Sequence, residues 1–238
     1  MEISFFEEFP IESNLRKLEL VNFSTKLYLA AKSLNEFNKI KIKNSIYWPV
    51  LDKKEGYWIS PFSTRKALLR IFNELKNENI PVMLDLELPT TQNPWLYLKS
   101  FNFFRNKNLI KSFINNYQGE VYLAEYYPKG KWKEAVLSWL GLHYKNAKII
   151  KMLYHSLHNF SERFVKNELQ KGVNEFGKDY LVALGTISVG IHGNDPILSA
   201  KQLKQDLRLA KLAGVKEVII FRLAGLNKRY VKIIEEFL

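Results

Sequence analysis

The segment Pro81-Val82-Met83-Leu84-Asp85-Leu86-Glu87 is a short apolar run that ends at two carboxylates. Its length and its bounding proline predict a buried β-strand that is followed by a polar loop. The stretch before it, over about 64–79, places Leu68, Phe72 and Leu75 on one helical face. Helix and strand together form one unit of a pattern that recurs along the whole chain.

Eight apolar runs alternate with polar turns and amphipathic stretches. This alternation predicts parallel strands joined by right-handed helical crossovers. Eight units favour a single-domain (β/α)8 TIM barrel over residues 1–238, in which the first strand pairs with the last. An open Rossmann-like sheet is the rival, but no Gly-x-Gly-x-x-Gly turn follows the first strand. The expected strands are Ile3–Phe6, Lys26–Ala30, Ser45–Val50, Val82–Leu86, Glu120–Ala124, Lys148–Tyr154, Tyr180–Leu184 and Glu217–Phe221.

The composition narrows the classes of function. The chain has no cysteine, which excludes disulfides, thiolate metal sites and a cysteine nucleophile. It has no apolar run near the roughly 20 residues of a membrane span and no signal-peptide pattern, so we expect a cytoplasmic protein. The net charge of +12 is compatible with a nucleic-acid partner. Because the basic residues are scattered along the chain, a solvated lysine-rich surface is the favoured interpretation.

Asp85 and Glu87 are the main candidates for catalysis. Successive strand residues point to opposite faces, so Met83, Asp85 and Glu87 share one face, and the apolar residues between them share the other. Helices cover the outside of a barrel, which predicts that both carboxylates point into its mouth. Two carboxylates this close hinder each other's ionisation, so one pKa should rise, as a general acid for glycoside cleavage requires.

The Asp85-Leu86-Glu87 ending resembles the D-x-E ending of strand four in chitinase-like and lysozyme-like glycoside hydrolase barrels. Met152-Leu153-Tyr154 is similar to the M-x-Y that chitinase-like enzymes carry on strand six. The resemblance implies that Glu87 is the acid/base, that Asp85 orients the acetamido group of the substrate and that Tyr154 holds its oxygen. Met83 stands where the longer family pattern has a further Asp.

Other polar and aromatic residues are expected near the strand ends. Glu125 follows strand five and is a candidate second acid or nucleophile. Glu7 and Glu8 follow strand one, and strand alternation does not decide which of the two side chains points into the barrel. Arg222 could clamp a substrate carboxylate or neutralise one of these glutamates. Aromatic rings around acidic groups are typical of sugar sites. The candidates for that rim are Trp48, Tyr57, Trp58, Trp95 and Tyr126.

Trp132 and Trp139 are assigned to the core instead of the site. They recur with Val136 at helical spacing, which predicts that both rings pack inward from one helix and are mostly buried.

These patterns predict a carbohydrate-active hydrolase, or a degenerate relative, that acts on a glycan without a cofactor. The first alternative is a metal-dependent isomerase or phosphodiesterase barrel in which His155 and His192 join Glu87 and Glu125. The second is a non-catalytic barrel that binds sugar or nucleic acid. A bound metal would favour the first alternative, and a continuous basic groove across the mouth would favour the second.

Overall fold

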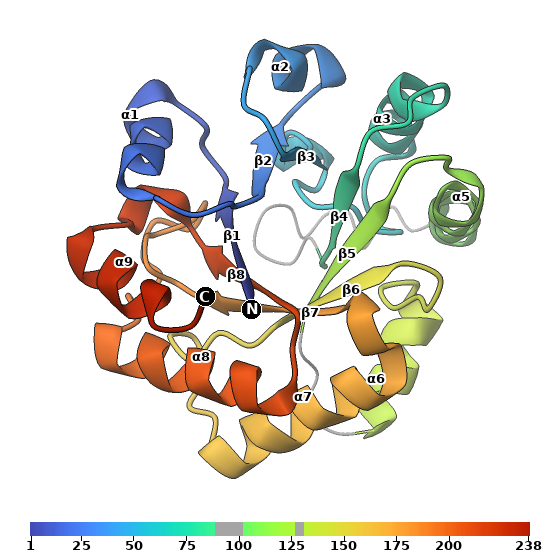
Figure 1. Ribbon diagram of the computed structural model, residues 1–238. Coiled ribbons are helices and arrows are strands. Elements are labelled where there is room, and N and C mark those ends of the chain that lie inside the picture. The colour runs from blue at the N-terminus through green and yellow to red at the C-terminus, as the bar shows by residue number, and fades with distance from the viewer. Residues whose placement is uncertain (89–101, 127–130) are drawn as a thin grey trace. The chain divides into compact units, whose positions relative to one another are not determined.

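The computed structural model describes residues 1–88, 102–126 and 131–238. Its eight parallel strands pair in chain order and close into a barrel, which confirms the predicted fold class (Figure 1). Each strand begins and ends within two residues of its expected range. The strands are β1 (Glu2–Glu7), β2 (Leu27–Ala31), β3 (Ser45–Pro49), β4 (Val82–Leu86), β5 (Val121–Tyr126), β6 (Lys148–Met152), β7 (Tyr180–Gly185) and β8 (Glu217–Phe221).

Helices follow the strands along the chain. Ser161 and Ser199 cap α7 and α8, because each hydroxyl accepts a hydrogen bond from a backbone N–H of the first turn. None of the helices described is both long and apolar enough to cross a bilayer. The helices are α1 (Glu12–Leu15), α2 (Leu34–Lys39), α3 (Arg65–Leu75), α5 (Phe103–Asn116), α6 (Lys131–Leu140), α7 (Glu162–Phe176), α8 (Ala200–Ala213) and α9 (Lys228–Glu235).

The chain forms two compact units. The first contains residues 1–29, 42–45 and 149–238, and the second contains residues 30–41 and 46–148. The predicted pairing of the first and last strands lies within the first unit. There β1 and β8 run in parallel register from Glu2 opposite Glu217 to Phe6 opposite Phe221, as the closed barrel requires.

In the first unit, ring contacts show which face of each strand points inward. The Phe6 ring lies 5.2 Å from that of Tyr28 and 6.2 Å from that of Phe221, between centroids, so these three residues share the inner face. Tyr180 points the opposite way, because its ring packs on α7 at Gly172. A side chain at Gly172 would collide with that ring, since its Cβ would lie 2.1 Å from two ring atoms.

In the second unit, the position of the Tyr47 ring shows which face of β4 points inward. Its ring contacts Phe37 of α2 at a centroid distance of 5.1 Å, so Tyr47 faces the helical layer. Val82 is its register partner and points the same way. By alternation, Met83 and Asp85 then face inward, as the sequence predicts, and Glu87 follows directly after the end of the strand.

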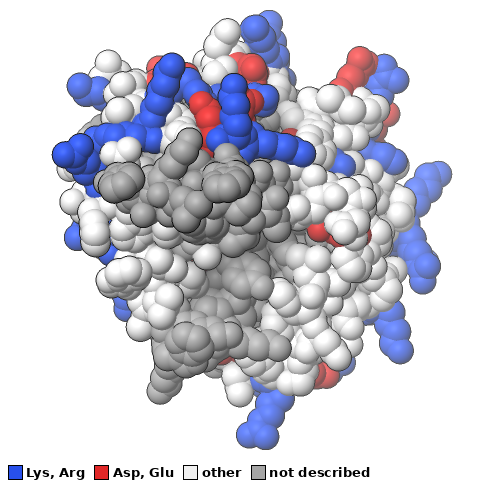
Figure 2. Space-filling view, turned by 180° about the vertical axis from the view of Figure 1, so that it is seen from behind, with Lys and Arg blue, Asp and Glu red and all other residues white. Residues whose placement is uncertain are grey.

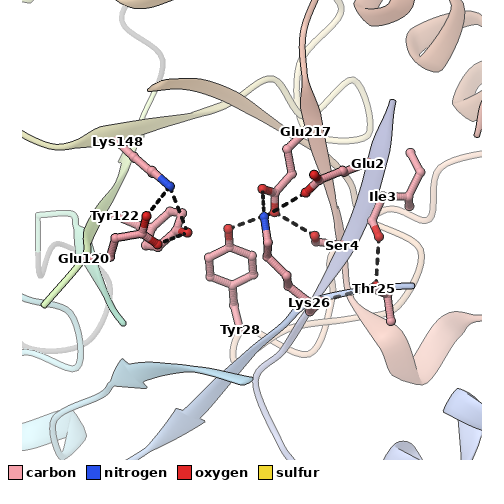
Figure 3. Close-up of polar contacts among 10 residues, drawn as sticks. All are labelled: Glu2, Ile3, Ser4, Thr25, Lys26, Tyr28, Glu120, Tyr122, Lys148 and Glu217. Atoms are coloured by element: carbon pink, nitrogen blue, oxygen red, sulfur yellow. Dashed lines mark hydrogen bonds and ion pairs between the residues drawn. The ribbon is translucent and has the colours of Figure 1, made fainter. Parts of the chain in front are cut away.

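Polar side chains surround the amino ends of several strands (Figure 3). In the first unit, the buried Glu217 carboxylate accepts hydrogen bonds from Ser4 Oγ at 2.7 Å and Tyr28 OH at 3.1 Å, and it pairs with Lys26 Nζ at 2.6 Å. These contacts join β8, β1 and the start of β2. In the second unit, Glu120 pairs with Lys148 and accepts a hydrogen bond from the Tyr122 hydroxyl. At these amino ends, polar side chains that are hydrogen-bonded or ion-paired with one another take the place of apolar packing.

The prediction that Trp139 is buried is wrong, because its side chain is 61% exposed. The reason lies in the course of the chain after α6. Lys107 Nζ of α5 donates to the Trp139 carbonyl, and the Tyr144 N–H donates to Glu125 near the carboxyl end of β5. Helix α6 thus ends near the start of α5. The spacing of apolar residues defines one face of a helix, but it does not say which neighbouring element, if any, covers that face. The side chain of Trp132 lies outside the described residues.

We expect Glu217→Gln to destabilise the protein by about 1–3 kcal/mol, because a buried, charge-assisted network loses its anion while its donors remain. Chemical denaturation followed by circular dichroism measures the change. The control is Glu2→Gln, since Glu2 binds the same Lys26 but its side chain is 67% exposed. Equal effects of the two substitutions would contradict a special role for the buried carboxylate.

Candidate active site

The inward Asp85 of β4 and the Glu87 that follows the strand form the centre of the candidate site. Asp85 is buried, and its register partner on β5 is Ala124. Glu87 lies directly after the strand and is partly exposed. The arrangement places one carboxylate inside the wall of the barrel and a second one at the open end of the same strand. Such ends carry the catalytic groups in TIM-barrel enzymes.

The loop between β3 and α3 borders this strand end. The Ile59 N–H donates to the Asp85 carbonyl at 3.0 Å, and Ile59 forms an isolated parallel bridge with Leu86. Tyr57, which has a φ of 60°, packs edge-on against Trp58. Both rings are more than nine-tenths buried, so they stabilise the loop and present little surface to a ligand.

Trp48, Trp95 and Tyr126 complete the predicted aromatic rim. Trp48 follows the outward Tyr47 in β3, so it faces inward, and it is buried. Trp95 and the side chain of Tyr126 lie outside the described residues.

Glu125 does not join Asp85. Its register partner is Leu86, which belongs to the outward face of β4. The Glu125 carboxylate lies 2.8 Å from His143 Nδ1 and accepts the Tyr144 N–H at 3.3 Å. The expectation that Glu125 is a second catalytic group in the mouth is therefore corrected. Parity on β5 selects Ala124 for the inner face, so Glu125 instead holds the segment that follows α6.

The structure distinguishes Glu7 from Glu8, which the sequence could not do. Glu7 is fully buried and bound by Arg222 Nη1 at 2.6 Å, together with backbone N–H groups of Phe9 and Ala224. Burial raises the pKa of Glu7, whereas the guanidinium and the backbone donors oppose that rise. Arg222 also donates to the Val189 carbonyl. The pair thus connects the loops after β1, β7 and β8, which agrees with the expectation that Arg222 neutralises one of the two glutamates.

Glu8 belongs to the opposite face. By alternation it follows the inward Ser4 and Phe6, and it is buried. Gly190 lies against its carboxylate, since a Cβ at that position would be 2.9 Å from Glu8 Oε2 and 3.0 Å from the Phe221 ring. Tyr154 also reaches Phe221, with 5.9 Å between ring centroids. The first unit therefore brings Glu8, Tyr154 and Phe221 to its inner face.

His155 points away from Tyr154 and is already engaged. Its Nδ1 lies 2.8 Å from Asp206 Oδ1 of α8, and its Nε2 lies 3.2 Å from the Phe160 carbonyl oxygen. Because both ring nitrogens face acceptors, the imidazole is held by protein groups and is not directed at a metal. His192 is exposed in the loop after β7. Within residues 1–88, 102–126 and 131–238, no three His, Asp or Glu side chains gather as a metal site would require.

Two buried polar residues escaped the sequence analysis. Asp206 and Asn106 are each 1% exposed and lie on helices. Each interrupts an otherwise apolar stripe: Asp206 lies between Leu203 and Ala210, and Asn106 lies between Phe103 and Ile110. A polar residue at such a position is the signal that could have identified them, because burial without a partner would be costly.

Lys and Arg side chains project separately around the face drawn in Figure 2. The densest group on that face is interleaved with Asp and Glu. Basic and acidic side chains are therefore mixed in that group. Among the exposed charges of the described residues, Lys32 Nζ pairs with Asp52 at 2.6 Å.

No protein-family model matches the chain, and no curated protein is significantly similar to it. Solved structures do match. A class V chitinase from Pseudomonas fluorescens aligns with a TM-score of 0.61 at 11% identity over 99% of both chains. The chain has the same barrel fold as this chitinase. The spore cortex-lytic enzyme SleL of Bacillus megaterium aligns at 0.56 and 13% identity, over 100% of this chain and 74% of that one. The PgaB (BpsB) glycoside hydrolase domain of Bordetella bronchiseptica aligns at 0.53 and 10% identity, over 99% and 98%.

The His155–Asp206 pair predicts a pH-dependent stability. Burial lowers the pKa of His155, but the Asp206 carboxylate and the Phe160 carbonyl raise it, and the net shift is upward from 6.5. The stabilisation should be fully present below about pH 6.5 and lost as the pH rises through the folded-state pKa. We expect His155→Gln to cost about 2 kcal/mol at pH 6 and clearly less at pH 9.

Urea denaturation of both proteins from pH 6 to pH 9 measures the difference in stability. The control is Asp206→Asn, which should remove most of the pH dependence that His155 contributes. A cost of His155→Gln that is independent of pH would contradict a charged imidazole in the folded protein.

Proposed function

We propose that this chain is a carbohydrate-active hydrolase that cleaves a glycan with Glu87 as the general acid. The observation that carries the proposal is the buried, inward Asp85 at the carboxyl end of β4, with Glu87 directly after that strand end. The chain shares its barrel fold with proteins described as chitinases, cortex-lytic enzymes and a glycoside hydrolase domain.

The two carboxylates differ in setting, and the proposal gives them different roles. Glu87 is partly exposed beyond the strand, so it can reach the oxygen of a glycosidic bond and transfer a proton to it. Asp85 is buried on the same face. The proposal makes Asp85 the like-charged partner two residues away, whose repulsion favours the protonated form of Glu87 before reaction. As the bond to the leaving group breaks, the Asp85 carboxylate stabilises the positive charge that develops on the sugar ring. A water molecule then adds to the anomeric carbon, and the proton that it releases restores the acid form of Glu87.

Further residues extend the proposal. Tyr154 remains the predicted orienting hydroxyl, and Glu8 and Trp48 remain predicted substrate contacts from their inward positions. Glu7 and Arg222 are left out because they bind one another. In the proposal, Tyr57 and Trp58 do not contact the substrate but stabilise the loop between β3 and α3 that borders the strand end.

The decisive experiment compares the wild type with Glu87→Gln on chromogenic glycosides and on fragments of chitin, peptidoglycan and α-glucan. Glutamine preserves the shape of the side chain but cannot donate the proton, so turnover should fall about 10²–10⁴-fold while the fold persists. Asp85→Asn should also reduce turnover. Glu12→Gln is the matched control, because that side chain is 79% exposed and binds only Arg16 of the next turn among its described contacts.

A glycosidase activity that survives Glu87→Gln would show that Glu87 is not the acid. If no glycan is bound or cleaved and a divalent metal copurifies with the protein on Glu87 and a histidine, the isomerase or phosphodiesterase alternative replaces this proposal. Circular dichroism of every variant separates loss of function from loss of fold.

A further inference from the structure

Asn106 lies where the packing of α5 calls for an apolar residue. The buried face of this helix contains Phe103, Ile110 and Ile114, and Asn106 continues the same stripe at helical spacing. Its side chain is almost completely buried. Asparagine is a poor helix former, and an amide removed from water is costly unless it is fully hydrogen-bonded. The position therefore calls for a reason other than packing.

The contacts of Asn106 supply that reason. Its Nδ2 donates to the carbonyl oxygens of Pro61 at 3.0 Å and Ser63 at 2.9 Å, both in the loop between β3 and α3. Its Oδ1 accepts from Arg65 Nη1 at 3.4 Å. The Arg65 donor and the two carbonyl acceptors fix the orientation of the amide. In a flipped amide the Oδ1 atom would face the two carbonyl oxygens, and the NH2 group would face the Arg65 guanidinium.

The same loop supports the strand that carries the candidate catalytic carboxylates. Two residues before Pro61, the Ile59 N–H donates to the Asp85 carbonyl. Ser63 Oγ donates to the Trp58 carbonyl at 2.8 Å, which closes the loop on itself. Residues 59–63 thus connect the Asn106 amide to the backbone of Asp85 through a short, hydrogen-bonded segment.

We propose that Asn106 is a positioning residue that clamps the β3–α3 loop and thereby holds the carboxyl end of β4 in its catalytic geometry. The inference rests on the proposed function for the reaction that this geometry serves. Helix α5 is the next described helix after β4, so the clamp connects one strand–helix unit to the loop of the unit before it. Displacements near 1 Å at a catalytic group can reduce turnover about 10²-fold, which makes such a clamp consequential.

Asn106→Asp tests the clamp with almost no change in size. A carboxylate at this position would turn an acceptor toward the Pro61 and Ser63 carbonyls and repel the loop, while Arg65 could still bind it. The matched control is Asn116→Asp in the same helix, where the side chain is exposed and donates to Ser112 one turn earlier. A milder second variant, Arg65→Met, removes the donor that fixes the amide, and it should act in the same direction with a smaller effect.

The first readout needs no substrate. In Asn106→Asp we expect the Ile59 amide to exchange its hydrogen at least about 10-fold faster, because the local opening of the loop becomes easier. The carboxyl ¹³C resonances of Asp85 and Glu87 should shift relative to the wild type. In Asn116→Asp both readouts should stay unchanged. Unchanged exchange and unchanged carboxyl resonances in a folded Asn106→Asp protein would overturn the proposal.

The second readout uses whichever glycan the wild type cleaves. We expect kcat to fall about 10-fold or more while KM changes less than about 3-fold, because the clamp acts on the reacting groups and not on the sugar. Equal losses in kcat for Asn106→Asp and Asn116→Asp would overturn the positioning role. Absence of turnover in the wild type would count against the proposed function alone, since exchange and carboxyl resonances would still decide whether Asn106 positions the strand.

Discussion

The pairing of β1 with β8 is the constraint on which the geometry of the barrel depends. Once Glu2 lies opposite Glu217 and Phe6 opposite Phe221, each residue of either strand has a definite face. A slip of one residue would reverse every side chain on the strand, because the period of a strand is two. Register therefore decides that Phe6 and Phe221 meet inside, and that Glu7 and Arg222 meet outside.

The two glutamates after β1 illustrate how much one residue of register matters. Glu7 and Glu8 are chemically identical neighbours, yet Glu7 accepts hydrogen bonds from Arg222 and two backbone N–H groups in the loops outside the strands. Glu8 lies inside against Gly190. A buried carboxylate with this many donors holds loops together. Its neighbour, one position along the chain, stays a predicted substrate contact.

Strand β4 depends on a different kind of support. Asp85 owes its direction to alternation along β4, but the contacts that support this strand end come from a loop of the preceding strand–helix unit. The Ile59 bridge, the strained Tyr57 backbone and the Asn106 amide all act on that loop. The hydrogen bonds that hold this strand end come from residues distant in sequence, and the proposed function requires such firm support because a catalytic carboxylate must be held in place.

The sequence by itself determined the eight strands, their order and the inward face of β4, because these follow from local periods of two and 3.6 residues that any short window displays. It did not determine the partners of polar side chains. It offered Arg222 as a partner of Glu7 or Glu8 without choosing between them, and it placed Glu125 in the mouth, whereas Glu125 faces His143. It also misplaced Trp139, since periodicity defines an apolar face without naming what covers it. Those outcomes were decided only by the tertiary structure, because register and the course of connecting segments bring together residues that no local pattern relates.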